Sequence, residues 1–496
     1  MTNCLAVDTR PAQPRVAPGP RGSRFLGVLP ELRGNPLQFA VKTAQTFGSV
    51  ARLPLGTQSL FMVNHPDLVA HVLHENGPNY RKSRFYEKLV PFFGEGLITS
   101  NGTVWREQRQ VCQPAFSGPN LRLMVKDMAA LAGAMIDRWS EAEGPIEITG
   151  EFMRLNLAIA LKTLFSATLH EEEVGRLQGA LTTLLRVAEK RLWGMTSLAE
   201  HLPLPENFAF RRAVKVLDEI VYRIIRERRQ RREPASDLFQ LLLDARDSAG
   251  KAFGDKWLRD QIASILTAGY ETNACAFAWT SCLLSKHSDV ERHLHREVAE
   301  VLGGRSPTFD DLSKLSYAKM VFHESMRLYP PIWTISREAI EADEIGGYHV
   351  PAGSAVMISP YAMHRDRRFW ENPEGFDPDR FSPERERDRP RYAYLPFGGG
   401  QRNCIGNRFA LLEALVVLSM VLQRFRLDLV PGQRIDPEPM ISLRPRYGML
   451  VTLYRREEAE SDHARLTASG RVPAAVPSVR HSCPIHSGLT PVPAEN

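Results

Sequence analysis

One cysteine lies in a glycine-rich loop whose composition suits the binding of a metal ion. The loop reads Phe397-Gly398-Gly399-Gly400-Gln401-Arg402-Asn403-Cys404-Ile405-Gly406 and leads into an apolar helical pattern. Its glycines let the backbone lie close against a flat ligand. A cation two residues before the sulfur and the N–H groups of a helix that begins near Ile405 both lower the pKa of the Cys404 thiol. The pattern therefore predicts that Cys404 is an iron-bound thiolate.

A second segment whose residues could take part in a reaction is Ala268-Gly269-Tyr270-Glu271-Thr272, inside a long apolar helical pattern. Ala268 and Thr272 are four residues apart, so they face the same side of the helix. Gly269 leaves room for a bound ligand close to the backbone. Two interpretations stay open: Glu271 and Thr272 handle protons, or Thr272 bonds a carbonyl of its own helix while Glu271 faces water.

The cysteine loop matches the pattern Phe-x-x-Gly-x-Arg-x-Cys-x-Gly at every fixed position, and the chain therefore resembles the cytochrome P-450 family of haem-thiolate monooxygenases. The resemblance implies that Cys404 is the axial ligand of a haem iron. It places Phe397, Gly400 and Gly406 around the haem. It also implies that Thr272 donates a hydrogen bond to the oxygen being activated and that Glu271 supplies protons.

Further site residues follow from the same resemblance. Trp105, Arg109, Arg337 and Arg402 match positions that contact the haem propionates, for which bidentate arginine pairing is physically sensible. Glu324 and Arg327, three residues apart on a helix, are expected to form a buried ionic network with Arg380. The expected substrate pocket is apolar and draws on Phe85, Phe92, Leu97, Ala268, Ile332, Trp333, Ile335 and Leu443. For each of these residues, packing in the core stays open as the alternative.

The 496 residues, 43% hydrophobic and 24% charged, have the composition of a globular protein. The resemblance implies the mainly α cytochrome P-450 fold, a large helical domain with small β-sheets, and no composition break within residues 25–455 argues against one such domain. A Pro-rich segment precedes it at 1–24, and the composition of 456–496 predicts a disordered tail. Periodicity predicts helices at Leu121–Ser140, Phe152–Leu169, Glu173–Glu189, Phe208–Arg232, Trp257–His287, Asp289–Leu302 and Tyr317–Leu328, a hairpin at Ser49–Asn64, and strands at Gly347–Val350, Ala355–Ser359 and Met449–Tyr454.

The six cysteines are scattered without a Cys-x-x-Cys pair, which favours reduced thiols and a cytoplasmic setting. Even the apolar run Leu411–Leu422 is interrupted by Glu413, so no integral membrane segment is expected. The net charge of +6 is modest. The basic run Arg226–Arg232 is interpreted as a solvated helix end rather than a nucleic-acid site.

The predicted function is hydroxylation or epoxidation of a hydrophobic small molecule by haem b and O2. Terpenoid, fatty acid, carotenoid and polyketide-like substrates all fit. Electrons would pass from NAD(P)H through a ferredoxin reductase and a ferredoxin, with Arg106, Arg365, Arg367 and Arg368 as docking contacts. Two alternatives stay open: a haem-thiolate peroxygenase or isomerase, and a non-catalytic haem-binding sensor or carrier.

Overall fold

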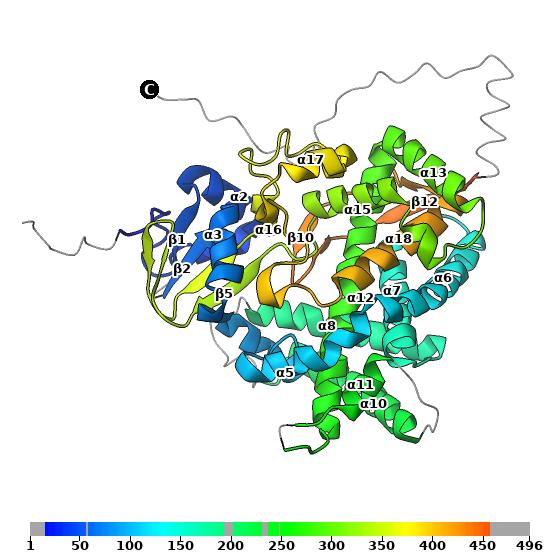
Figure 1. Ribbon diagram of the computed structural model, residues 1–496, viewed down its shortest axis with the longest axis horizontal. Coiled ribbons are helices and arrows are strands. Elements are labelled where there is room, and N and C mark those ends of the chain that lie inside the picture. The colour runs from blue at the N-terminus through cyan, green and yellow to red at the C-terminus, as the bar shows by residue number, and fades with distance from the viewer. Residues whose placement is uncertain (1–14, 56–57, 193–201, 231–236, 248, 457–496) are drawn as a thin grey trace, which may run out of the picture.

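The fold was studied in a computed structural model that describes residues 15–55, 58–192, 202–230, 237–247 and 249–456. Most of the described chain is helical, with the largest sheet at the left of Figure 1 and smaller sheets, marked by β10 (Pro437–Pro439) and β12 (Leu450–Arg455), among the helices. This confirms the expected mainly α fold. Among the described helices, none is long and apolar enough to cross a membrane. The expected tail, apart from Arg456, and with it Cys483, lies outside the described residues.

The long helices follow the predicted pattern, with ends that shift by a few residues. α7 ends at Phe165 rather than Leu169 because Ser166 adopts a left-handed conformation with φ 46°. The main helices are α6 (Gly118–Ser140), α7 (Ile148–Phe165), α8 (Glu171–Leu192), α10 (Pro205–Gln230), α12 (Asp255–Lys286), α13 (Ser288–Leu302), α15 (Ser316–Leu328) and α18 (Asn407–Arg424). The shorter ones include α2 (Pro36–Phe47), α3 (Pro66–Ala70), α5 (Gly102–Cys112), α11 (Leu238–Asp244) and α16 (Pro360–Met363).

The largest sheet has the strand order β1-β2-β8-β5-β3. The predicted hairpin forms its first pair, in which Val50 lies opposite Val63 in antiparallel register. Its strands are β1 (Val50–Leu55), β2 (Gln58–Val63), β8 (Ala355–Ile358), β5 (Ile335–Ala339) and β3 (Tyr80–Lys82). The smaller sheets join β4 (Ile146–Glu147) to β12 (Leu450–Arg455) and β9 (Phe425–Leu429), β6 (Asp343–Ile345) to β7 (Tyr348–Val350), and β10 (Pro437–Pro439) to β11 (Leu443–Pro445).

One expectation about a segment end needs correction, and a second segment end makes contacts that the sequence did not indicate. The basic end of α10 is not simply solvated, because Arg228 is 7% exposed and bonds both carboxylate oxygens of Asp237 at 2.5 Å. The described part of the expected N-terminal segment packs on the sheet, since Ala17 is buried and the Arg52 N–H donates to the Pro18 carbonyl. Residue 231 onward in the basic run lies outside the described residues.

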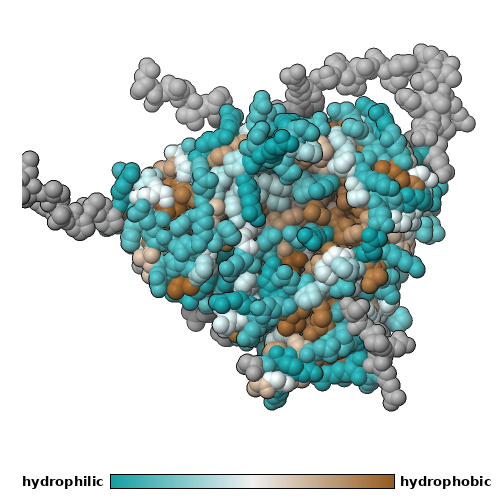
Figure 2. Space-filling view, in the orientation of Figure 1, coloured by the Kyte–Doolittle hydropathy of each residue, from teal (hydrophilic) through white to brown (hydrophobic). Residues whose placement is uncertain are grey.

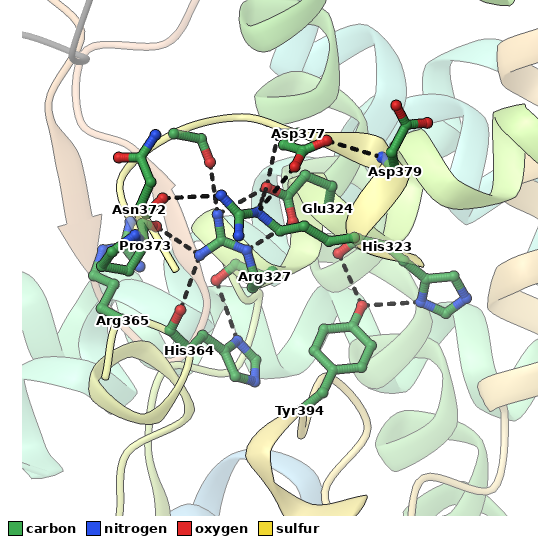
Figure 3. Close-up of polar contacts among 12 residues, drawn as sticks. His323, Glu324, Arg327, His364, Arg365, Asn372, Pro373, Asp377, Asp379 and Tyr394 are labelled. Carbon is green, nitrogen blue, oxygen red and sulfur yellow. Dashed lines mark hydrogen bonds and ion pairs between the residues drawn. The ribbon is translucent and has the colours of Figure 1, made fainter. Parts of the chain in front are cut away.

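A buried ion pair lies within α15, and its arginine also connects this helix to the long segment before the cysteine loop. Arg327 and Glu324 have no exposed side-chain surface, and Arg327 Nε donates to Glu324 Oε2 at 2.7 Å. The remaining N–H groups of Arg327 reach Glu324 Oε1 and the carbonyls of His364, Pro373 and Gly375 (Figure 3). All five donors of the guanidinium are therefore satisfied.

Arg380, the third expected member, lies in the short helix Pro378–Phe381 and approaches the same acid. Its Nε is 3.3 Å from Glu324 Oε1, and its Nη groups donate to the carbonyls of Glu371 and Asn372. Glu324 Oε1 also accepts from the Asp377 N–H at 2.9 Å. The structure thus brings all three predicted network residues together, and they fix residues 371–380 against α15.

His364 extends this network to the chain that enters the cysteine loop. Its Nδ1 lies 3.1 Å from the Arg327 carbonyl, and its Nε2 accepts from the Leu395 N–H at 2.8 Å. Burial lowers the pKa of His364 well below 6.5, so the neutral ring donates from Nδ1 and accepts at Nε2. Beside it, Tyr394 donates to the His323 carbonyl (Figure 3). The loop therefore starts from a fixed backbone.

A second buried acid, Glu413, lies between α7, α12 and α18. Asn273 Nδ2 donates to Glu413 Oε2 at 2.6 Å. With its amide nitrogen toward the carboxylate, Asn156 donates to the other oxygen at 3.2 Å. Burial raises the pKa of Glu413 from 4.5 to about 8, against the opposing effect of Asn273. The acid is therefore neutral in the folded protein at pH values where it is charged in the unfolded chain.

Replacing Arg327 by Ala should lower the free energy of unfolding by about 3–5 kcal/mol, because it removes the bidentate partner of the buried Glu324 carboxylate and leaves only the more distant Arg380 as counter-charge. The measurement is denaturant unfolding of the purified protein. Arg122→Ala is the matched control, since Arg122 forms the same bidentate pair with Asp310 on the surface. Equal losses for the two variants would contradict the importance assigned to the buried pair.

Glu413→Gln should flatten the pH dependence of stability. Between pH 4.5 and about 8 the folded protein keeps a proton that the unfolded chain has lost, so wild-type stability falls as pH rises through this window. The variant lacks this loss, and its stability relative to wild type should grow toward pH 8. Melting temperatures at several pH values test this, with the exposed Glu172→Gln as control. Parallel curves for wild type and Glu413→Gln would refute the assignment.

Candidate active site

The cysteine loop is closed by its own backbone and packed against the sheet side of the molecule. The Cys404 N–H donates to the Phe397 carbonyl at 2.9 Å. Gly400 has φ +65°, and a Cβ there would lie 1.6 Å from the Leu73 carbonyl oxygen. Only glycine fits this position. The loop therefore holds a fixed shape before any ligand binds.

Cys404 is accessible at its surface, although protein surrounds it on most sides. Desolvation raises the pKa of its thiol, while a hydrogen bond from the Gly406 N–H and the charge of Arg109 lower it. Gly406 caps α18, which begins at Asn407 rather than at the predicted Ile405. The sulfur thus lies at the positive end of a helix dipole, where an anionic ligand atom is favoured.

Two of the predicted cofactor contacts, Arg402 and Arg109, converge on a third, Trp105. The guanidinium carbon of Arg402 is 4.5 Å from the centre of the Trp105 ring, and that of Arg109 is 5.7 Å away. Arg109 also donates to the Asn403 carbonyl at 2.8 Å, which ties α5 to the cysteine loop. The ring is buried, so it serves as a common platform for the two cations.

Arg337 and a residue that the sequence did not single out, Lys82, complete a cluster of cations. The two are directly opposite each other on β5 and β3. Desolvation, together with the charges of Arg402, Arg337 and Arg109, lowers the pKa of Lys82 to about 6. The ammonium group donates to the carbonyls of Leu97 and Ser100. Lys82 thus belongs to the same positively charged site.

This cluster fits an anionic cofactor. Burial and the charge of Arg337 lower the pKa of Arg402 to about 10, and its Nη1 atom is buried without a hydrogen-bond partner. Among the described residues that act on these cations, the groups that raise their pKa values are Tyr86 and thiols, not carboxylates. Uncompensated buried cations are unfavourable. Haem propionates are the counter-charges that the predicted cofactor would bring.

α12 is buried along almost its whole length and opens to solvent at one place. Between Leu258 and Leu284, every residue is buried except Ala268, Gly269 and Thr272. The Thr272 hydroxyl donates to the Ala268 carbonyl at 2.7 Å. This is the hydrogen bond to a carbonyl of its own helix that the second interpretation of the segment predicts for Thr272. The accessible stripe keeps this hydroxyl within reach of a ligand.

The same interpretation also predicts that Glu271 faces water, and this part is wrong. It is 3% exposed, and its Oε2 atom is buried without a hydrogen-bond partner. Desolvation raises the pKa of Glu271, whereas a hydrogen bond from the Ser442 hydroxyl and the charge of Arg444 lower it. The carboxyl therefore points toward the β10–β11 hairpin.

The predicted substrate residues divide into accessible and buried ones. Phe85, Leu97, Ala268 and Ile332 have accessible surface. Phe92, Trp333 and Leu443 are at most 2% exposed, which favours core packing for these three, and their assignment to a pocket stays a prediction. Phe92 packs against Phe210 at 4.8 Å, and Trp333 donates to the Met440 carbonyl. Ile335, 7% exposed, belongs to the core of the sheet region beside the cysteine loop.

The proposed docking cations also divide. Arg365 is buried against Tyr361 and pairs with Glu374 at 3.2 Å, so it cannot meet a partner protein. Arg368 pairs with Asp366 and donates to the Asn64 carbonyl. Arg106 and Arg367 are exposed. Figure 2 shows hydrophobic residues gathered around α12 and α18, with hydrophilic residues around them.

Comparison with known proteins places this geometry in a family. The profile of the family described as Cytochrome P450 matches residues 17–452. Cyclooctatin synthase of Streptomyces melanosporofaciens is 35% identical, covering 88% of this chain and 94% of its own. Cyclooctat-9-en-7-ol 5-monooxygenase of the same organism is 35% identical over 86% and 92%. Pentalenene oxygenase of Streptomyces avermitilis is 30% identical over 82% and 90%.

The match covers nearly all the described residues and includes both the cysteine loop and the accessible part of α12. The relatives are similar over almost their full lengths. The chain therefore belongs to the cytochrome P450 family and is a haem-thiolate monooxygenase.

Proposed function

We propose that the protein hydroxylates or epoxidises a hydrophobic terpenoid with O2 and two electrons supplied by a partner protein. The observation that carries this proposal is the accessible Cys404 thiol beside a buried cation cluster that lacks a carboxylate counter-charge among the described residues. In the net reaction a substrate C–H bond and O2, with two protons and two electrons, give an alcohol and one water molecule.

Haem b is the proposed cofactor, with Cys404 as its iron ligand and Arg109, Arg337, Arg402 and Lys82 facing its propionates. When bound, it supplies iron for oxygen activation, and a thiolate ligand promotes cleavage of the O–O bond. The protein holds the thiolate through the Gly406 N–H and the Arg109 charge. It holds the loop by the Cys404 to Phe397 backbone bond.

Thr272 and Glu271 divide the handling of protons. Thr272 keeps a hydroxyl on the accessible face of α12, where rotation away from the Ala268 carbonyl frees its proton. Glu271 is buried, and its raised pKa lets it hold a proton closer to neutral pH than an exposed carboxyl can. The acid therefore stores the proton that the alcohol presents.

The substrate class rests on the names of the relatives and on the apolar accessible residues. Those relatives are named for cyclooctatin, cyclooctat-9-en-7-ol and pentalenene. In this chain Phe85, Leu97, Ala268 and Ile332 offer apolar surface with few polar groups. Such a lining selects by shape and apolar area, which suits a cyclic terpenoid skeleton.

A ferredoxin and its reductase are the proposed electron source, docking beside the cysteine loop. Arg106 supports docking beside the cysteine loop for two reasons. It is exposed, and its charge lowers the pKa of Arg402, a residue of that loop. Arg367 is a second exposed cation. An acidic partner would be drawn to these cations, so turnover should fall with rising salt.

Cys404→Ala should abolish the strongly red-shifted Soret band of the reduced, carbon-monoxide-bound protein, because that band reports a thiolate opposite the gas. Cys275→Ala, which changes a buried cysteine of α12, should retain it. Persistence of the band in Cys404→Ala would refute the ligand assignment. Turnover with peroxide but not with a ferredoxin system would favour a peroxygenase, and a normal band without any turnover would favour a sensor or carrier.

Thr272→Ala should lower product per electron and raise peroxide release, because the hydroxyl that presents the proton is lost. A decrease of about 10²-fold in product formation is at the low end for general acid catalysis. The control is Thr280→Ala two turns later, where the hydroxyl also donates to a carbonyl four residues back, at 2.7 Å, but is buried. Unchanged coupling in Thr272→Ala would remove Thr272 from the proton path.

A further inference from the structure

The β10–β11 hairpin is held against α12 by backbone and indole hydrogen bonds. Trp279, two turns after Glu271 on α12, donates to the Leu443 carbonyl at 2.9 Å. Trp333 donates to the Met440 carbonyl at 2.8 Å, and the Leu443 N–H donates to the Pro331 carbonyl at 2.8 Å. The tip of the hairpin, residues 440–442, is therefore fixed relative to the buried face of α12.

Ser442 is the hairpin residue that meets Glu271. It is 2% exposed, and its hydroxyl donates to the Glu271 carboxylate. Burying an acid is costly unless it is hydrogen-bonded or paired with a charge. Among the described residues the Oε2 atom of Glu271 has no hydrogen-bond partner, so the contact with Ser442 and the charge of Arg444 are what offset its burial.

The same hairpin reaches solvent on its other side. Glu438 and Arg444 are directly opposite each other on β10 and β11, and Arg444 Nε donates to Glu438 Oε2 at 2.9 Å. Both are partly exposed, at 26% and 17%. They line a surface pocket of about 810 Å³ that also includes Arg186, Lys190, Arg434 and Asp436. Ser442 precedes Arg444 by two residues in the chain, so it is close in sequence to an ion pair that borders this pocket.

We propose that protons for oxygen activation reach Glu271 through Ser442, from the pocket bounded by the Glu438–Arg444 pair. The inference rests on the proposed function and adds a relay residue and a direction to it. When Glu271 gives up its proton, the Ser442 hydroxyl transfers its own proton to the carboxylate and takes another from a water molecule of the pocket. The hydroxide that remains is neutralised by buffer, so no charge accumulates.

The charges around Glu271 suit such a relay. Arg444 favours the charged carboxylate and Glu438 opposes it. The pair therefore leaves the carboxyl able to take either form, whereas an isolated arginine would hold it charged. Ser442 is a positioning residue in this scheme, since it acts through Glu271 and does not touch the substrate.

The first test uses Ser442→Ala with Ser419→Ala as matched control, because Ser419 is a buried serine whose hydroxyl donates to the Val416 carbonyl of its own helix. Infrared absorption of the protonated Glu271 carboxyl, assigned by its loss in Glu271→Gln, is titrated in each variant. Removing the Ser442 donor should move the titration to higher pH, and Ser419→Ala should leave it in place. An unchanged titration in Ser442→Ala would overturn the contact.

The second test measures coupling in the haem-loaded protein. Ser442→Ala should slow proton-limited product formation about tenfold, less than the roughly 100-fold loss of a general acid itself, because water can partly replace the hydroxyl. The solvent deuterium isotope effect and peroxide release should rise, and Ser442→Thr should restore both. Coupling equal to that of Ser419→Ala would overturn the relay.

A third comparison separates the pocket from the buried contact. Arg444→Gln removes the ion pair beside Ser442, whereas Arg434→Gln removes the Arg434–Asp436 pair of the same pocket. Only Arg444→Gln should alter the isotope effect, and equal effects would overturn the proposed direction. A missing red-shifted carbon-monoxide band in the wild type would instead reject the proposed function, while the infrared titration would still test the Ser442 contact.

Discussion

The buried pair of Glu324 and Arg327 is the constraint on which the position of the cysteine loop depends. Two charges without any exposed side-chain surface are tolerated only if every donor and acceptor finds a partner. Arg327 meets this demand by binding the carbonyls of His364, Pro373 and Gly375. Segments far apart in the sequence are thereby held at one guanidinium. His364 in turn accepts a hydrogen bond from the Leu395 N–H, which fixes the chain just before the loop.

The cation cluster beside Cys404 differs from this network because its charges and donors are not satisfied by the protein alone. The network around Arg327 satisfies itself, whereas Lys82 and Arg402 have lowered pKa values and Arg402 keeps a buried N–H group without a partner. An anionic cofactor would raise these pKa values and satisfy that group. Cofactor binding and folding are therefore coupled through this cluster, and the rigid network supplies the frame in which the coupling takes place.

The fold and the residues of the cysteine loop could be predicted because their signals are local. Glycines at fixed spacing, a cation before Cys404 and a 3.6-residue period need no tertiary information. The role of Lys82 could not be predicted, since it depends on β3 pairing with β5 opposite Arg337. The burial of Phe92 and Trp333 was missed for a related reason: an apolar residue near a site packs the core or faces a ligand according to contacts that its sequence neighbours do not determine.

The placement of Glu271 shows how one helix separates two tasks. Consecutive residues of an α-helix point about 100° apart, so an acid followed directly by an alcohol leaves the helix in a different direction. In α12 the alcohol takes the accessible face and the acid takes the buried face toward the hairpin. The relay proposed through Ser442 would then deliver protons to the acid from the hairpin, by a route that does not cross the accessible face.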